Sequence, residues 1–193
     1  MKIFVGVTDP NWFQFLRESD PSEVNFWRPG GQKFAALSPG ELFLFKLKAP
    51  YNVIAGGGFY VRYIQLTLSL AWDVFGLKNG AADYPTFRQR LIGLRSDAHP
   101  NPQIGCIVLT SPFFFSEGKW IEVPDSFAKN IVSGKTYDTR TDADGQILWR
   151  KVQDRLASQS VVSQNDASPT IVAEELAKYG AGYVAKNRLG QSG

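Results

Sequence analysis

The feature that most constrains the fold is a long apolar run at residues 51–66, YNVIAGGGFYVRYIQL. Its β-branched and aromatic residues predict a strand, the longest of the chain. Three consecutive glycines, Gly56 to Gly58, interrupt this strand. Glycines inside a strand mark bulges, bends or the close approach of another group. We therefore expect a strand that bends, within a sheet that is small and strongly curved or closed into a barrel.

The other segments predict a mixture of strands and helices. Further strands are expected at residues 2–7, 23–27, 103–115 and 119–124, and residues 38–50 are expected to form a turn, then a strand that ends at a proline. Helices are expected at residues 8–18, capped by Asp9, at 69–76, capped by Ser69, and at 84–95 and 145–158. Strands and helices do not alternate regularly, so a doubly wound parallel sheet is not expected. The pattern predicts an α+β fold.

The character of the chain changes near residue 158. The stretch SQSVVSQNDASPT, which begins there, is polar and typical of a linker, and a capped helix is expected after it. We therefore expect a compact domain over residues 1–157, followed by a linker and helix over residues 158–193.

Composition limits the classes of protein and site. A hydrophobic content of 44% suffices for one core, and a net charge of +3 permits a polyanionic partner without requiring one. A single cysteine, Cys106, and a single histidine exclude an internal disulfide and the usual zinc sets. No stretch approaches the roughly 20 apolar residues of a membrane span, and no signal sequence is visible, so a cytoplasmic location is expected.

Catalytic patterns are missing from the sequence. It contains no Walker loop and no nucleophile elbow, the glycines at 56–58 lack the dinucleotide-binding spacing, and the carboxylates are scattered. No cofactor or metal is therefore expected. Whether the chain is an enzyme stays open, although this chain alone shows no catalytic site.

Aromatic rings beside turn glycines are the more informative pattern. In EVNFWRPGGQKF, residues 23–34, Phe26 and Trp27 precede a Pro-Gly-Gly turn, with Arg28 and Lys33 beside them. Rings at strand ends, where the backbone leaves the sheet, can line the mouth of a barrel. A nucleobase stacked there gains about 1–3 kcal/mol.

A second informative segment, residues 128–140, is expected to be a flexible loop. Lysines beside Gly134 suit phosphate contact, Tyr137 can stack on a base, and Asp138 can accept from the amino group of cytosine. An ordinary charged surface loop is the alternative interpretation.

Several segments together resemble the N-terminal half of bacterial HNH restriction endonucleases that act on modified DNA. They are MKIFVGVTDPNWF, EVNFWRPGGQKFAALSPGELFLFKLKAP, IAGGGFY, SLAWDVFGLKNGA, IGCIVLTSPFFF, WIEVPDSFAKNIVSGKTYD and RLGQ. In that family the nuclease domain begins just after a segment like RLGQ. The resemblance implies that this chain is a specificity half used in phage defence and that residues 158–193 lead towards a missing HNH domain.

Residues 27–47 are similar to the core of EVE and YTH domains, which belong with SRA modules to the PUA superfamily. This implies a small bent β-barrel of PUA-like type with flanking helices. It also implies a pocket that takes a 5-methylcytosine or 5-hydroxymethylcytosine base flipped out of the duplex. Trp27 matches an aromatic position of the EVE-like motif, beside Asn25, and the Tyr137–Asp138 pair resembles residues that some SRA modules place on cytosine.

These arguments predict two groups of site residues. Base-binding residues are expected to be Trp27, Asn25, Tyr137, Asp138, Phe59 and Tyr60, and phosphate-binding residues Arg28, Lys33, Lys129, Lys135 and Arg140. The expected partner is double-stranded DNA carrying modified cytosine, with no membrane. An RNA-binding PUA-type module and a free-standing enzyme with a small-molecule substrate are the alternatives. The modification read, its sequence context and dimerisation through the parent protein stay open.

Overall fold

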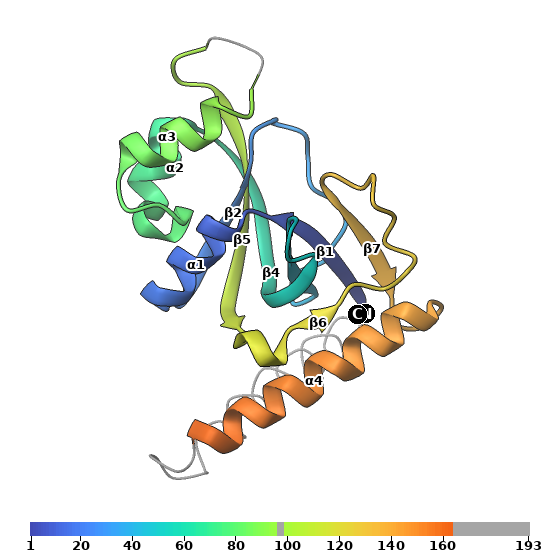
Figure 1. The fold of residues 1–193 in the computed structure, drawn as a ribbon. Coiled ribbons are helices and arrows are strands. Elements are labelled where there is room, and N and C mark those ends of the chain that lie inside the picture. The colour runs from blue at the N-terminus through green and yellow to red at the C-terminus, as the bar shows by residue number, and fades with distance from the viewer. Residues whose placement is uncertain (96–98, 164–193) are drawn as a thin grey trace, which may run out of the picture. The chain divides into compact units, whose positions relative to one another are not determined.

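The computed structural model describes residues 1–95 and 99–163 and divides the chain into compact units Met1–Arg150 and Lys151–Gly193. Figure 1 shows the ribbon, in which helix α4 crosses the boundary between the units. The predicted boundary at residue 157 stays a prediction, and most of the predicted linker and the last helix lie outside the described residues. The elements of the described ranges are β1 (Lys2–Thr8), α1 (Pro10–Ser19), β2 (Glu23–Arg28), β3 (Leu42–Leu47), β4 (Val53–Thr67), α2 (Leu68–Phe75), the 3-10 helix η1 (Gly76–Asn79), α3 (Tyr84–Ile92), β5 (Gln103–Phe114), the 3-10 helix η2 (Glu117–Lys119), β6 (Ile121–Glu122), β7 (Gly134–Asp138) and α4 (Ala143–Ser163).

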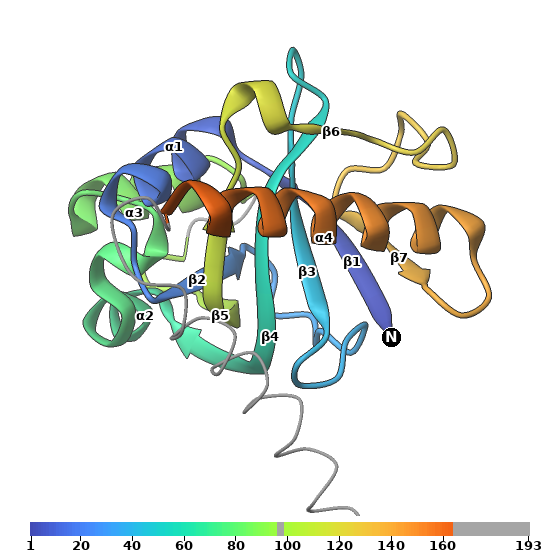
Figure 2. The ribbon, with the colours of Figure 1, turned by 90° about the horizontal axis from the view of Figure 1, so that it is seen from below.

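The strands form a single seven-stranded sheet with the order β2-β5-β4-β3-β1-β7, and β6 pairs with β4 beside this path. Figure 2 shows the strands in this order. Strands β1 and β3 pair in parallel, and the other pairs are antiparallel. Within the described ranges the terminal strands β2 and β7 do not pair with each other, so the sheet stays open. The expected α+β class is confirmed, with the curved sheet unclosed.

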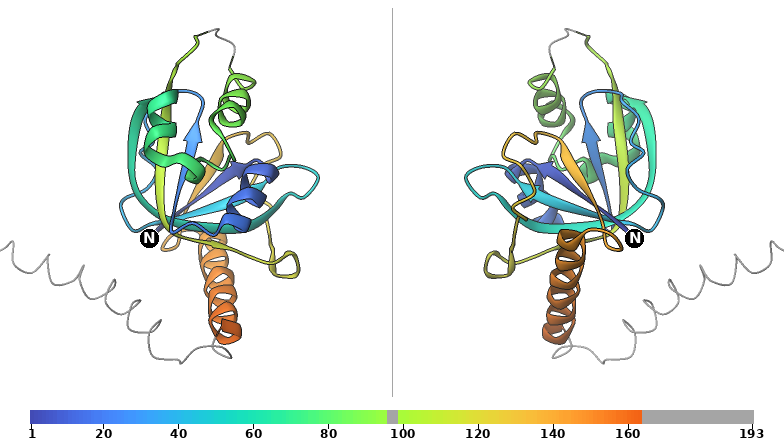
Figure 3. Two further views of the ribbon diagram at one scale, coloured as in Figure 1. Left: turned by 90° about the vertical axis from the view of Figure 1, so that its left-hand side faces the viewer. Right: turned by 90° about the vertical axis from the view of Figure 1, so that its right-hand side faces the viewer.

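Strand β4 bends at its glycines, as predicted. Its pairing with β5 shifts register between Gly57 and Phe59 and again between Tyr60 and Arg62, and Figure 3 shows the strand curving along its length. A Cβ atom on Gly56 would lie 2.3 Å from the Phe113 carbonyl oxygen, and one on Gly57 would lie 2.5 Å from the Phe43 carbonyl oxygen. The neighbouring backbones therefore approach too closely for any side chain here.

Gly57→Ala is accordingly expected to lower the free energy of unfolding by about 1–3 kcal/mol, because the added methyl group meets backbone that cannot move independently. Urea denaturation measures this change. Gly118→Ala is the matched control, since a Cβ atom there meets nothing within 4 Å, and it should change stability by under about 1 kcal/mol. Equal urea midpoints for Gly57→Ala and Gly118→Ala would contradict the close approach of the Phe43 backbone to Gly57.

Strand β5 is buried on both faces over residues 104–109, which explains the continuous apolar sequence of that half. Ile107 and Leu109 belong to one core cluster, together with the α1 residues Trp12, Phe13 and Leu16. The alternate residues Ile104, Cys106 and Val108 belong to a second cluster, with α2 and α3 residues. Figure 1 shows α2 and α3 side by side near β2 and β5. Cys106 is therefore a core thiol, and burial raises its pKa while Asn25 partly offsets the rise.

The observed N-cap is the predicted residue in α1 and a different residue in α2. Asp9 caps α1, and its Oδ1 accepts from Asn11 N at 2.9 Å and from Trp12 N at 3.3 Å. The expected cap of α2 at Ser69 is wrong: Thr67 caps the helix, accepting from Leu70 N at 3.4 Å. The helix begins at Leu68, immediately after β4 ends, so the last strand residue takes the capping position.

The predicted loop at residues 128–140 is wrong over its second half. Residues Gly134–Asp138 form β7, which pairs antiparallel with β1, and Tyr137 lies opposite Ile3. The polar residues of this segment gave no strand pattern in the sequence. The strand forms because it pairs with β1, which lies more than a hundred residues away in sequence.

Candidate functional site

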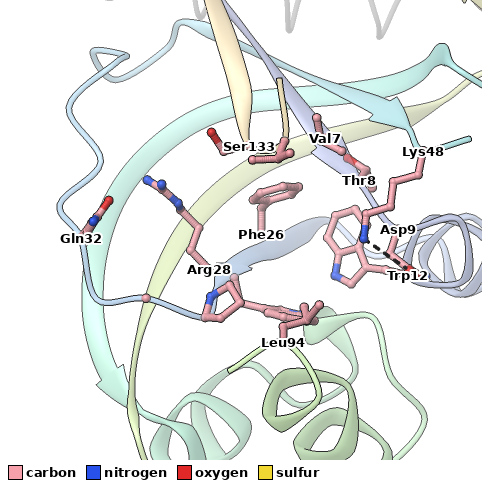
Figure 4. Close-up of a pocket in the computed structure, with 14 residues that line it drawn as sticks. Val7, Thr8, Asp9, Trp12, Phe26, Arg28, Gln32, Lys48, Leu94 and Ser133 are labelled. Atoms are coloured by element: carbon pink, nitrogen blue, oxygen red, sulfur yellow. Dashed lines mark hydrogen bonds and ion pairs between the residues drawn. The ribbon is translucent and has the colours of Figure 1, made fainter. Parts of the chain in front are cut away.

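A cleft opens where β1 meets α1 and where β2 ends, entirely within the unit Met1–Arg150. Its volume is about 610 Å³, within the range of about 300–1,000 Å³ typical of small-ligand sites. Figure 4 shows the cleft with its lining side chains. The lining residues are Val7, Thr8, Asp9, Trp12, Phe26, Trp27, Arg28, Pro29, Gly30, Gln32, Lys48, Leu94, Val132 and Ser133.

The ring of Phe26 lies at the centre of the cleft (Figure 4). It packs edge-on against Trp12, with 5.5 Å between ring centroids, and at 4.7 Å against Phe43 of β3. Trp12 is almost completely buried, whereas Phe26 is only partly buried. The core therefore fixes one side of the Phe26 ring, and part of the ring faces the cleft.

Trp27 also lines the cleft, and it packs against both core clusters. Its ring meets Phe87 of α3 edge-on at 5.7 Å, and its indole Nε1 donates to the Asn79 carbonyl oxygen at 2.9 Å. Adjacent strand residues point to opposite faces, so Trp27 reaches Phe87 of α3 while Phe26 packs against Trp12 and Phe43.

Asn79 of η1 holds this end of β2 in place. Its Oδ1 accepts from Asn25 Nδ2 at 2.8 Å, and its own Nδ2 donates to the carbonyl oxygens of Ala71 at 3.1 Å and Gly76 at 2.9 Å. Asn25 is 0% exposed. In this conformation the Asn25 side chain supports the wall behind Trp27 and has no surface for a ligand.

The cleft carries two cations and one carboxylate. Arg28 is partly buried, and its guanidinium makes no hydrogen bond or ion pair within residues 1–95 and 99–163. Lys48 Nζ lies 4.0 Å from Asp9 Oδ2, and the same Asp9 carboxylate caps α1 through its Oδ1. In Figure 4 Arg28 and Lys48 lie on opposite sides of the Phe26 ring. This charge arrangement favours an anionic ligand such as a phosphate.

The loop after β2 is held by side chains of neighbouring segments, despite its glycines. The Gly31 carbonyl oxygen accepts from Tyr63 Oη at 3.1 Å and also from Gln65 Nε2. The Pro29 carbonyl oxygen accepts from the Arg95 guanidinium. The rim that carries Arg28 is therefore fixed before any ligand arrives.

The residues predicted on the 128–140 segment lie away from the cleft and contact one another. Tyr137 is 1% exposed, and Lys135 Nζ lies 4.8 Å from its ring centroid and donates to the Ser126 carbonyl oxygen at 2.6 Å. Asp138 accepts from Arg140 N at 2.9 Å, and this bond holds the pKa of its carboxyl below the usual value. Burial raises the pKa of Tyr137.

The remaining predicted residues are also outside the cleft. Tyr60 is buried, with 5.5 Å between its ring centroid and that of Phe34, and burial raises the pKa of Tyr60. Phe59 packs against Phe113 at 6.4 Å. Lys33 and Lys129 are exposed and do not line the cleft.

Of the eleven predicted site residues, the cleft thus brings together Trp27 and Arg28. Sequence reasoning passed over Phe26, Trp12 and Lys48. Phe26 is both a core and a cleft ring. No local signal marks Trp12 and Lys48, because they reach the cleft only through the packing of α1 and β3.

In the described ranges no group of three or more His, Cys, Asp or Glu side chains could hold a metal ion. None of the helices in those ranges has the length and apolar character needed to cross a membrane.

No family model matches the chain, and no curated protein matches its sequence. Solved structures of an ASCH protein from Zymomonas mobilis share the fold. One gives a TM-score of 0.53 at 10% identity, covering 77% of this chain and 94% of that one. A tyrosine-to-phenylalanine variant gives 0.54 at 11% identity, covering 78% and 98%. The chain therefore shares its fold with these ASCH structures.

Proposed function

We propose that the chain is a nucleic-acid-binding module whose cleft receives one unstacked nucleobase. The observation that carries the proposal is the partly exposed Phe26 ring at the centre of an open cleft, beside an Arg28 guanidinium with no partner within the described residues. A base stacks on an aromatic ring, and the guanidinium binds the adjoining phosphate. The cleft volume of about 610 Å³ leaves room for a nucleotide.

We propose further that the base is a modified cytosine, 5-methylcytosine or 5-hydroxymethylcytosine, in DNA. The support for this step is the sequence resemblance to the specificity half of modification-dependent HNH endonucleases. The apolar part of the cleft lining, which includes Val7, offers a niche for a substituent at carbon 5. The chain would then supply recognition, and a nuclease domain elsewhere in the protein would supply cleavage.

A binding panel with one variant tests both steps. Fluorescence anisotropy would compare duplexes carrying one 5-methylcytosine, one 5-hydroxymethylcytosine or no modification with the matched single strand and RNA. We expect a modified duplex to bind tightest. Arg28→Ala should weaken binding and reduce the slope of log affinity against log salt by about one, because one phosphate contact is lost.

Lys129→Ala is the control, since Lys129 is an exposed cation outside the cleft. A salt slope that changes with Lys129→Ala and not with Arg28→Ala would move the interface to the surface around Lys129, outside the cleft. Equal affinity for modified and plain duplexes would overturn the modified-cytosine step, and tighter binding of RNA would favour the RNA-binding alternative. No binding to any probe would overturn the proposal as a whole.

A further inference from the structure

Two exposed apolar side chains stand at the cleft. Val132 is 86% exposed and is the most exposed large hydrophobic residue of the described ranges, and Leu94 is 58% exposed. Both line the cleft. Isolated exposed hydrophobics are normal on a protein surface. A pair at one opening, contributed by separate segments, calls for a partner with apolar surface.

The backbone next to each side chain is held. Leu94 follows α3, and its N donates to the Leu91 carbonyl oxygen at 3.1 Å. Val132 precedes Ser133, whose carbonyl oxygen accepts from Val7 N at 3.0 Å. In Figure 4 Leu94 and Ser133 lie on opposite sides of the Phe26 ring. The segment that carries Val132 and Ser133 and the segment that carries Leu94 therefore line different sides of the cleft.

The surroundings limit the chemistry of the partner. Arg28 and Lys48 line the same cleft, so the partner carries anionic groups as well as apolar faces. A base stack edged by phosphates combines the two. Proteins that distort duplex DNA commonly insert apolar side chains between base steps, and a flipped base leaves a gap in the stack that such a side chain can fill.

We propose that Val132 and Leu94 form an apolar wedge that enters the space left in a DNA duplex when a base moves into the cleft. The inference rests on the proposed function and deepens it, because it names duplex DNA rather than a single strand as the partner. A single strand has no paired stack in which a gap must be filled. The wedge therefore contributes to duplex binding alone.

The test uses the double variant Val132→Ser, Leu94→Ala in the full chain. Both side chains are exposed, so the fold should be retained, and circular dichroism checks this. We expect about tenfold weaker binding to a duplex carrying one 5-methylcytosine, because unstacking is no longer offset, and less than about twofold change for the matched single strand. A 2-aminopurine placed next to the modified base should brighten less with the variant.

The matched control is Val74→Ser, Leu77→Ala. These side chains are each 53% exposed on α2 and η1 and do not line the cleft, so both affinities should stay unchanged. An unchanged duplex affinity in the wedge variant, or an equal loss on duplex and single strand, would overturn the inference. Tighter binding of the single strand or of RNA by the unaltered protein would overturn it while leaving base binding intact. No binding to any probe would overturn the proposed function with it.

Discussion

Replacing Phe26 by alanine is expected to weaken nucleic-acid binding by about ten- to a hundredfold, the largest binding effect of any single change in the cleft. Stacking of one base on an aromatic ring contributes about 1–3 kcal/mol, and about 1.4 kcal/mol corresponds to a factor of ten. The ring is central in the cleft, and its packing against Trp12 and Phe43 holds it ready to stack. Titration of a labelled duplex by fluorescence anisotropy measures the loss.

Two further variants separate stacking from stability, because Phe26 also packs against the core. Phe26→Leu keeps apolar volume but removes the π-face, so most of the affinity should be lost with a smaller cost in stability. Phe34→Leu truncates a buried ring of the same cluster that does not line the cleft. It should lower stability and leave affinity unchanged. If Phe26→Leu bound nucleic acid with full affinity, the Phe26 ring would not be the surface on which the base stacks.

Replacing Asn79 by alanine is expected to lower the free energy of unfolding by about 3–5 kcal/mol, the largest stability effect of a single polar change. Asn79 is 1% exposed, and its truncation leaves Asn25 Nδ2 and the carbonyl oxygens of Ala71 and Gly76 without their partner. Each buried polar group left unpaired costs about 1–3 kcal/mol. Chemical denaturation followed by circular dichroism measures the change.

Asn101→Ala is the matched control. The Asn101 side chain accepts from Ser69 N at 3.0 Å and donates to Ser69 Oγ at 3.0 Å, but it is only partly buried. Water can replace its bonds, so the loss should stay near about 1 kcal/mol. Asn79→Asp keeps an acceptor for Asn25 and loses both donors, so its stability should be as low as that of Asn79→Ala or lower. Similar stability of Asn79→Ala and Asn101→Ala would show that the Asn79 bonds contribute little.

Local sequence was sufficient wherever a residue's role depends on its near neighbours. The glycines at 56–58 predicted the bend of β4, and Asp9 with Pro10 predicted the start of α1. The apolar run at residues 103–115 predicted a strand, and β5 lies there. Backbone conformation and capping are set within a few residues, so these features were visible without the fold.

The placement of the site residues depended on partners far along the chain. Asn25 was predicted to face a base, and it is buried because Asn79 lies beside it in space, 54 residues away in sequence. Tyr137 was expected on a flexible loop, and pairing of β7 with β1 buries it. The sequence around a polar or aromatic residue does not indicate which distant residue it will contact.

The sequence by itself determined a curved α+β sheet with a capped first helix, since glycine flexibility, capping and apolar periodicity act over a few residues. Only the tertiary structure decided where a ligand can enter. The cleft joins residues 7–9, 12, 26–30, 32, 48, 94 and 132–133. They become neighbours only because the strand order and the packing of the flanking helices bring distant segments to one end of β2. Those contacts follow from how the whole chain buries its apolar surface, which no short stretch encodes.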